Sequence, residues 1–233
     1  MLEVRSLDAW YGKARILFEV SLGVGEGECV ALMGRNGAGK STTMKAIMGL
    51  IARRDGHVVW RGQDISAWPG YRIARLGLGW VPEDRRIFTD LTVRENLTVG
   101  RQPPHSGAPA WTEEQVFALF PNLAAMPDRL GGRMSGGEQQ MLTIARTLMG
   151  NPHLILLDEP SEGVAPVIVE QMAQMIVRLK QEGLSILLSE QNLHFARLVC
   201  DRAVVLEKGQ VRYADSMQAL MADEQVQRTY LSV

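Results

Sequence analysis

The chain has 233 residues, 46% of them hydrophobic and 22% charged, which is ordinary for a globular protein with a substantial core. Its 25 Lys and Arg residues nearly balance its 26 Asp and Glu residues, which argues against DNA or an anionic lipid surface as the main partner. No apolar run reaches the roughly 18 residues that span a bilayer, so any role at a membrane is expected through docking to another chain.

The first 85 residues predict a strand-rich segment that is interrupted by one helix. The predicted strands are LEVRSLDAWY, ECVALM, HVVW and GLGWVPE. The stretch KSTTMKAIMGL, which follows ECVALM after a glycine-rich turn, is a predicted helix. Cys29 lies in the second strand; because neither it nor Cys200 has CxxC or metal-ligand spacing, we expect both to be reduced core residues.

The segment from about residue 86 to 150 has no strand pattern and is predicted to be helical. Ser or Thr is followed three residues later by Glu or Gln, the capping-box pattern of a helix start, at Thr92–Glu95, Thr112–Gln115 and Ser135–Glu138. Between the first two starts, QPPHSGAPA is a predicted loop, because it is rich in Pro and Gly.

Strands and helices alternate again after residue 150. HLILLDE, LSILLSE and DRAVVLEKG are predicted strands, and the first two are so apolar that we expect parallel strands buried on both faces. PVIVEQMAQMIVRLKQEG is a predicted helix that begins at Pro166 and ends before Gly183. The sequence therefore predicts one α/β domain over residues 1–233. Its core would comprise 1–85 and 151–233, with a helical sub-domain inserted at 86–150.

The segment GRNGAGKS, Gly34 to Ser41, matches the phosphate-loop pattern GxxxxGK[ST] between a predicted strand and a predicted helix. Gly37 and Gly39 allow the backbone N–H groups to point at phosphate oxygens, where the helix also directs its positive end. We expect Lys40 to reach the β- and γ-phosphates and the Ser41 hydroxyl to hold Mg²⁺. The predicted ligand is ATP with Mg²⁺. The predicted nucleotide contacts in this loop are Gly34, Arg35, Asn36, Gly37, Ala38, Gly39, Lys40, Ser41 and Thr42.

The apolar strand Leu154 to Leu157 ends in two acidic residues. Asp158 emerges at the carboxyl end of this strand, where ligands bind in open α/β sheets, and is expected to position Mg²⁺. Glu159, one residue further on, is placed to polarise the attacking water as a general base. A polar strand end is common by itself, but together with the phosphate loop it predicts ATP hydrolysis.

The segment MSGGEQQ, residues 134–140, begins the predicted helix EQQMLTIARTLMG. Ser135 and Glu138 suit a helix cap, and the two consecutive glycines also expose backbone N–H groups that could bind an anion. Because the loop at Gly34–Ser41 already serves the chain's own phosphates, this second anion site suggests a nucleotide held by another subunit.

These motifs, in this order, closely resemble the ATP-binding cassette family over essentially the whole chain. MSGGEQQ resembles the family signature and lies about twenty residues before LILLDEP. The resemblance implies a P-loop NTPase (RecA-like) core with an N-terminal antiparallel β sub-domain and an inserted helical sub-domain. It also implies a head-to-tail pair of subunits, in which Ser135 and Gly137 of one contact the γ-phosphate held by Lys40 of the other. Gly136 belongs to the same nucleotide-binding loop.

The resemblance assigns further positions one at a time. Tyr11 aligns with an aromatic residue that stacks on adenine, and its neighbour Trp10 should face the opposite way by strand alternation. VPEDRRIFTDLTVRENL resembles the loop that senses Mg²⁺ and contacts the membrane subunits, with Glu83 in place of the usual Gln. In SEGVAP, which resembles the loop that crosses the dimer interface, Ala165 stands where many members carry Asp.

The catalytic set implied by the resemblance has three members. Lys40 and Glu159 match the family's motifs, and Gln191 aligns with the switch histidine, so its amide is expected to donate a hydrogen bond to the γ-phosphate.

Four segments, VPEDRR, MSGGEQQMLTIARTLM, SEGVAP and SEQN, together resemble the smaller ATPase of branched-chain amino-acid importers. This implies an ATPase that is peripheral on the cytoplasmic face of the plasma (inner) membrane. Its partners would be a second, different ATPase subunit, two membrane-spanning permease subunits and, indirectly, a substrate-binding protein, with no nucleic acid.

Three other functions stay open at this point. The SEG segment and LHF at 193–195 also fit the ATPase of a urea or short-amide importer. A soluble cassette ATPase that acts on DNA or ribosomes is disfavoured, because the chain has neither a long coiled-coil insertion nor a second cassette. A non-hydrolysing partner is suggested by Glu83 and Gln191 but disfavoured by the intact catalytic motifs.

Overall fold

Ten strands form two sheets in the computed structural model, which describes residues 1–231. The strands are β1 Leu2–Tyr11, β2 Ala14–Val24, β3 Cys29–Met33, β4 Arg53–Trp60, β5 Gln63–Asp64, β6 Leu78–Val81, β7 Leu154–Asp158, β8 Ser185–Glu190, β9 Arg202–Glu207 and β10 Gln210–Ser216. The order β2-β1-β4-β5 makes an antiparallel sheet, and the order β10-β9-β3-β8-β7-β6 makes a sheet that is parallel except for β10. The predicted α/β fold with an N-terminal antiparallel sub-domain is confirmed.

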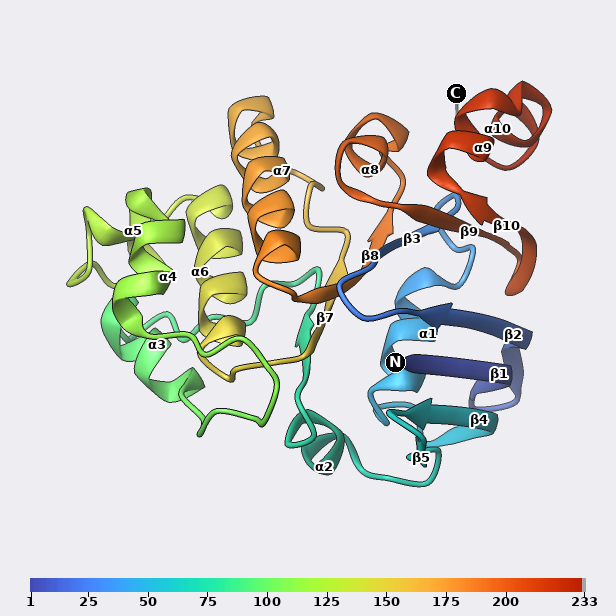
Figure 1. Cartoon of the computed structure of the whole chain (residues 1–233), viewed down its shortest axis with the longest axis horizontal. Coiled ribbons are helices and arrows are strands. Elements are labelled where there is room, and N and C mark those ends of the chain that lie inside the picture. The colour runs from blue at the N-terminus through green and yellow to red at the C-terminus, as the bar shows by residue number, and fades with distance from the viewer. Residues whose placement is uncertain (232–233) are drawn as a thin grey trace.

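The helices lie around the six-stranded sheet, as Figure 1 shows. They are α1 Lys40–Ile47, α2 Gly70–Ala74, α3 Val93–Gly100, α4 Glu113–Leu119, α5 Pro121–Ala124, α6 Gly136–Leu148, α7 Pro166–Gln181, α8 Leu193–Val199, α9 Met217–Ala222 and α10 Glu224–Tyr230, with a 3₁₀ turn at Gly131–Arg133. Helices α3 to α6 form a group at one end of the molecule, on the left of Figure 1. The division into sub-domains at residues 86 and 150 remains our proposal.

All three predicted capping boxes are present. In each, the Ser or Thr hydroxyl accepts from the backbone N–H of the Glu or Gln, whose side chain accepts from the backbone N–H of the cap, at Thr92–Glu95, Thr112–Gln115 and Ser135–Glu138. Helix α7 begins at Pro166 and ends two residues before Gly183, also as predicted.

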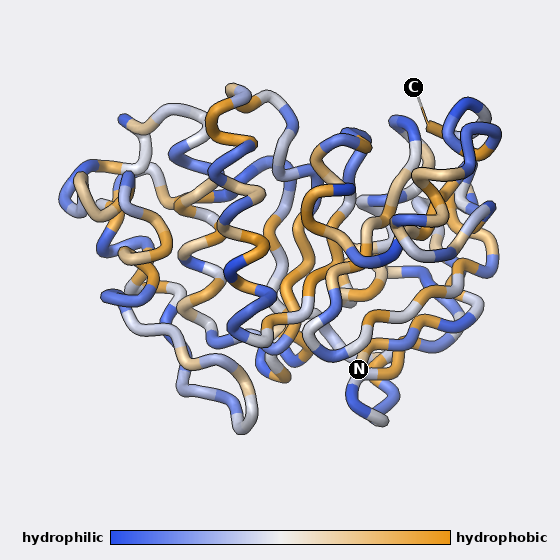
Figure 2. The backbone as a smooth tube through the Cα atoms, turned by 45° about the horizontal axis from the view of Figure 1, so that its top comes forward, coloured by the Kyte–Doolittle hydropathy of each residue, from blue (hydrophilic) through white to orange (hydrophobic). Residues whose placement is uncertain are grey.

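Two hydrophobic cores lie on opposite faces of the six-stranded sheet, because successive side chains of a strand point to opposite faces. Val30 and Leu32 of β3 pack with α1 and the antiparallel sheet. Cys29, Ala31 and Met33 pack on the other face with α6, α7 and α8. Figure 2 shows that the central strands are the most continuously hydrophobic part of the chain. The side chains of β7 and β8 also divide between the two cores, which confirms the predicted burial of these strands on both faces.

The two cysteines are buried and free, as predicted, with their Sγ atoms 3.2 Å apart. Within residues 1–231, none of the helices combines the length and the apolar character that crossing a bilayer requires.

Candidate nucleotide site

The phosphate loop connects β3 to α1. Gly37 and Gly39 have φ angles of 78° and 109°, in the left-handed region that glycine adopts without a steric cost. The Lys40 side chain folds back over the loop, where its Nζ donates to the carbonyls of Gly34 (2.8 Å) and Arg35 (3.2 Å). Lys40 is only 3% exposed, so its charge is held at one place beside the loop.

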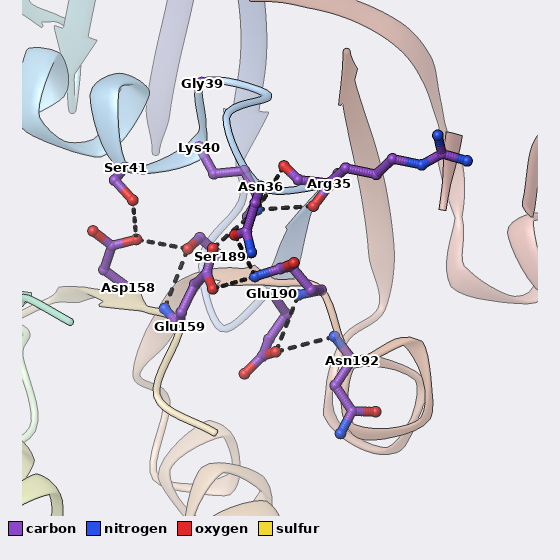
Figure 3. A network of polar contacts seen from close by, with 12 residues as sticks. Arg35, Asn36, Gly39, Lys40, Ser41, Asp158, Glu159, Ser189, Glu190 and Asn192 are labelled. Carbon is purple, nitrogen blue, oxygen red and sulfur yellow. Dashed lines mark hydrogen bonds and ion pairs between the residues drawn. The ribbon is translucent and has the colours of Figure 1, made fainter. Parts of the chain in front are cut away.

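The other predicted residues of the loop differ in where their side chains lie. The Asn36 side chain points into the cluster of polar contacts, whereas Figure 3 shows the Arg35 side chain directed away from it. Ala38 is buried in the turn, and Thr42 lies in the first turn of α1.

A predicted Mg²⁺ pair, Ser41 and Asp158, is brought together at the carboxyl edge of the sheet. The Ser41 hydroxyl donates to Asp158 Oδ1 at 3.0 Å, and the Ser189 hydroxyl donates to the same oxygen at 2.7 Å. Asp158 and Ser189 are opposite each other in the β7–β8 register, which explains the second contact. Burial raises the pKa of Asp158. A hydroxyl and a carboxylate are hard oxygen ligands, so these residues fit Mg²⁺.

Glu159 has a backbone φ of 45°, in the left-handed region, which costs a non-glycine residue about 1–3 kcal/mol. The surrounding contacts hold this conformation, because its backbone N–H donates to the Ser189 carbonyl at 3.1 Å. The side chain is 7% exposed, with Oε1 2.9 Å from Lys40 Nζ and Oε2 accepting from Gln191 Nε2 at 2.6 Å (Figure 3). The strained backbone therefore directs the carboxylate toward the phosphate loop.

The pKa of Glu159 reflects two opposed effects. Burial raises it, but hydrogen bonds from Glu162, Lys40 and Gln191, together with the Lys40 charge, outweigh burial and leave the pKa below its usual value. The side chain is consequently ionised at neutral pH, which a general base requires.

Gln191 joins this carboxylate to the phosphate loop, because its Nε2 also donates to Asn36 Oδ1 at 2.8 Å. The neighbouring Glu190, which the sequence analysis missed, is 2% exposed and accepts from the backbone N–H groups of Ser161, Gln191 and Asn192, each at 3.2 Å. Burial raises its pKa. Through these hydrogen bonds Glu190 connects the loop after β7 to the loop after β8.

Tyr11 ends β1 and is 49% exposed, so its ring is accessible to a planar ligand. Trp10 lies among cations, with the Arg53 guanidinium 4.6 Å and that of Arg15 5.7 Å from its ring centre.

Glu83 is exposed in the segment after β6. Within residues 1–231, its side chain forms neither a hydrogen bond nor an ion pair, so no contact links this predicted metal residue to Ser41 or Asp158. Its charge instead acts on Glu162. The role of Glu83 at the metal remains a prediction.

The signature segment lies apart from the phosphate loop. Figure 1 shows α6 and α1 on different sides of β7, and among the described residues no hydrogen bond joins Ser135, Gly136 or Gly137 to the loop. Arg85, which the sequence analysis did not single out, packs on this helix start: a Cβ added to Gly136 would lie 2.6 Å from its Nη1.

Comparisons with known proteins agree with this geometry. Residues 17–162, more than half of the chain, match the family model described as ABC transporter. The chain is 41% identical to the high-affinity branched-chain amino acid transport ATP-binding protein BraG of Pseudomonas aeruginosa, with 99% of each chain covered. It is 36% identical to the lipopolysaccharide export system ATP-binding protein LptB of Haemophilus influenzae, covering 99% of this chain and 97% of that one.

Among solved structures, a nucleotide-free ATP-binding cassette from an ABC transporter superposes with a TM-score of 0.82 at 26% identity, covering 97% of this chain and 96% of that chain. The likeness extends over both sheets and the helices between them.

Proposed function

This chain belongs to the ABC transporter family as one of its ATP-hydrolysing subunits, and we propose that it powers the import of branched-chain amino acids. The observation that carries the proposal is the full-length similarity to BraG at 41% identity, against 36% for LptB. The cargo is proposed from this similarity alone, because an ATPase subunit does not touch what is transported.

The proposed hydrolysis uses the contacts described above. Backbone N–H groups of the phosphate loop and the Lys40 ammonium hold the triphosphate. Ser41 and Asp158 would hold Mg²⁺, which would neutralise phosphate charge when bound. Glu159 takes a proton from water as the water oxygen bonds to the γ-phosphorus and the bond to the ADP oxygen breaks. Gln191 orients the Glu159 carboxylate from the side opposite Lys40.

The proposed working unit contains a second ATPase subunit. The N-terminus of α6 presents the N–H groups after Ser135 on a surface that this chain's own phosphate loop does not reach, which supports a nucleotide held by a partner. We propose that the partner is a different chain and that Tyr11 of each chain stacks on the adenine of its own ATP.

A groove of about 640 Å³ supports docking to a permease subunit. Its wall combines exposed apolar side chains with the guanidinium groups of Arg75, Arg86 and Arg146. Trp80 Nε1, also in this wall, is buried and finds no acceptor within residues 1–231. We propose that an apolar permease segment carrying a carboxylate or carbonyl acceptor fills the groove, which would place the chain on the cytoplasmic face of the membrane. The large exposed apolar residues here are Leu50, Tyr71, Phe88 and Val99.

The transport proposal is tested by reconstituting the chain with the membrane subunits and the binding protein encoded beside it. Radiolabelled leucine should enter vesicles only with ATP, and Lys40→Ala in this chain should abolish uptake. Uptake of urea in place of leucine would overturn the cargo, and release of lipopolysaccharide from the membrane would overturn the direction of transport and favour the LptB-like function.

The chemical proposal is tested separately with Glu159→Gln. The amide keeps the shape of the side chain but cannot take a proton, so we expect ATP to bind and a closed dimer to accumulate without turnover. Nucleotide binding is measured by titration, and the dimer by size-exclusion chromatography with ATP. Turnover at the wild-type rate would contradict the assignment of Glu159 as the base.

A further inference from the structure

The two cysteines of the chain meet in the folded core. Cys29 is the first residue of β3, and Cys200 follows the last residue of α8, 171 positions further on. Their Sγ atoms are nevertheless 3.2 Å apart. The S–S bond of a disulfide is about 2.05 Å long, so the two sulfur atoms need to approach by only about 1.15 Å to form one. Because the chain has no other cysteine, each thiol has the other as its only partner within the chain.

Hydrogen bonds hold the two segments together beside the sulfur atoms. The Cys29 N–H donates to Asp201 Oδ2 at 2.9 Å, and the Asp201 N–H donates to the Cys29 carbonyl at 2.8 Å. Lys180 of α7 donates to Asp201 Oδ1 at 2.8 Å and to the Val199 carbonyl at 3.0 Å. These contacts fix the spacing of the two backbones, so the sulfur atoms stay within reach of each other.

The two thiols differ in how accessible they are. Cys29 is fully buried, whereas Cys200 is 7% exposed and lines a pocket of about 600 Å³. The pocket lies between the end of α8 and the start of α9, and its wall also includes Met217 and Met221. A molecule of the size of water or hydrogen peroxide can therefore reach Cys200 directly, but it can reach Cys29 only by way of Cys200.

We propose that Cys29 and Cys200 form an oxidation site, at which hydrogen peroxide converts the two thiols into a reversible disulfide. In the first step the Cys200 sulfur attacks one peroxide oxygen, the O–O bond breaks, and Cys200 sulfenic acid and water are formed. In the second step the Cys29 sulfur attacks the Cys200 sulfur, the S–O bond breaks, and a second water leaves with the Cys29 proton. The two thiols lose two electrons, which reduce the peroxide to water.

The surroundings of Cys200 make the first step slow and the second step fast. Burial, followed by the neighbouring Cys29, raises the pKa of Cys200, so little of the reactive thiolate is present at neutral pH. The second step needs no diffusion, because Cys29 is already in contact with Cys200. We therefore expect the pair to respond to sustained oxidation. We also expect the reaction to stop at the disulfide, which a thiol reductant reverses, before the irreversible sulfinic acid forms.

The disulfide should stabilise the fold without changing the nucleotide site. It would close a long loop and so restrict the unfolded chain, and we expect the midpoint of thermal denaturation to rise by about 5–15 °C. The bond would join the start of β3 to the residue after α8. The phosphate loop follows the other end of β3, and Gln191 precedes the other end of α8, so the Kd for ATP should not change.

The experiment treats the purified full chain with hydrogen peroxide, blocks the remaining thiols with iodoacetamide and identifies the peptides by mass spectrometry without reduction. In wild type we expect two peptides joined through Cys29 and Cys200, lighter than the separate peptides by the hydrogen atoms lost, which dithiothreitol separates. In Cys29→Ala no such pair should form, and dimedone should trap the sulfenic acid on Cys200. In Cys200→Ala we expect Cys29 to remain a thiol, because it is fully buried.

The double variant Cys29→Ala/Cys200→Ala is the matched control for stability. Peroxide also oxidises methionine, of which the chain has 12, and dithiothreitol does not act on that product by thiol–disulfide exchange. Peroxide should raise the denaturation midpoint of wild type, and dithiothreitol should restore it. The double variant should show no such reversible rise, and an equal reversible rise in it would contradict the assignment of the stabilisation to the disulfide.

The proposal is overturned if both wild-type thiols stay free under peroxide that oxidises them in the urea-unfolded chain, because the folded pair is then inert. A sulfinic acid on wild-type Cys200 without a bond to Cys29 would show that Cys29 does not capture the sulfenic acid. A disulfide between two copies of the chain would show that the bond is not internal. Either of these results also contradicts the proposal.

Discussion

Gly209, in the turn between β9 and β10, is expected to control ATP affinity although it belongs to no nucleotide motif. Its N–H donates to the carbonyl of Ala38 at 2.8 Å, and its own carbonyl accepts from the N–H of Phe18 at 2.8 Å. The turn therefore connects the phosphate loop to β2. Its φ is 76°, and a Cβ added to it would lie 1.8 Å from the Ile16 carbonyl oxygen.

The size of the effect of Gly209→Ala follows from this distance. A Cβ almost never lies closer than 3.0 Å to another heavy atom, so the backbone must move by about 1.2 Å, the difference between 3.0 and 1.8 Å. A misplacement of about 1 Å in an active site can cost about 100-fold in catalytic rate, and we expect a smaller effect on binding. We expect the Kd for ATP to rise at least about tenfold, or ~1.4 kcal/mol. The free energy of unfolding should fall by about 2–5 kcal/mol, from the left-handed backbone and the overpacking together.

Gly183→Ala is the matched control. Gly183 also has a positive φ, 87°, but no atom lies within 4 Å of its added Cβ. The free energy of unfolding of the Gly183→Ala variant should therefore fall only by the backbone contribution of about 1–2 kcal/mol, and its ATP affinity should not change. Calorimetric titration with ATP and Mg²⁺ measures the Kd, and urea denaturation measures the free energy of unfolding. Equal Kd values for the two variants would refute the reasoning, because the phosphate loop would then not depend on the Gly209 contacts.

Three further predictions concern side chains. Lys40→Ala should weaken ATP binding by about 10- to 100-fold in a nucleotide titration, because a charged donor contributes about 1.5–3 kcal/mol; unchanged affinity would contradict its role. Gln191→Ala should lower kcat with little change in KM, because it frees the Glu159 carboxylate to turn; unaltered hydrolysis in the assembled transporter would count against it. Burial, Arg61 and His105 lower the pKa of His153, so the free energy of unfolding should fall as pH drops below about 6.5, and thermal denaturation should show a smaller fall for His153→Gln.

Elements with a strong local pattern could be predicted from the sequence, and edge elements could not. The capping boxes and the start of α7 depend on residues only a few positions apart in the sequence, so a local pattern predicts them. The structure has them at the predicted residues. Strand β10 was missed because it is an edge strand on which none of the residues is fully buried, so it lacks the apolar alternation that identifies a half-buried strand. Strand β2 is also absent from the predicted strands. Its residues alternate between buried and exposed, but the pairing of β2 with β1 shifts register at three places, and these shifts interrupt the alternation.

The candidate site divides in the same way. The phosphate loop is recognisable because its glycines and Lys40 act within eight consecutive residues, Gly34 to Ser41. Other residues reach the site only through strand pairing or through a turn that is distant in sequence, so no local sequence pattern predicts them. These residues are Ser189, Glu190 and Gly209. Glu83 illustrates the opposite case, in which a motif position predicted a metal role but the described contacts leave the side chain exposed.

The pair of Lys40 and Glu159 explains why separate motifs must be found together. Their side chains are 3% and 7% exposed and 2.9 Å apart. A buried charge without a partner costs several kcal/mol, so each of these two residues lowers the cost of burying the other. They are 119 positions apart in the sequence (159 minus 40), and the neighbouring strands β3, β8 and β7 bring them together. Each motif predicts its own chemistry, whereas the parallel sheet brings the Lys40 and Glu159 side chains close enough for the two charges to compensate each other.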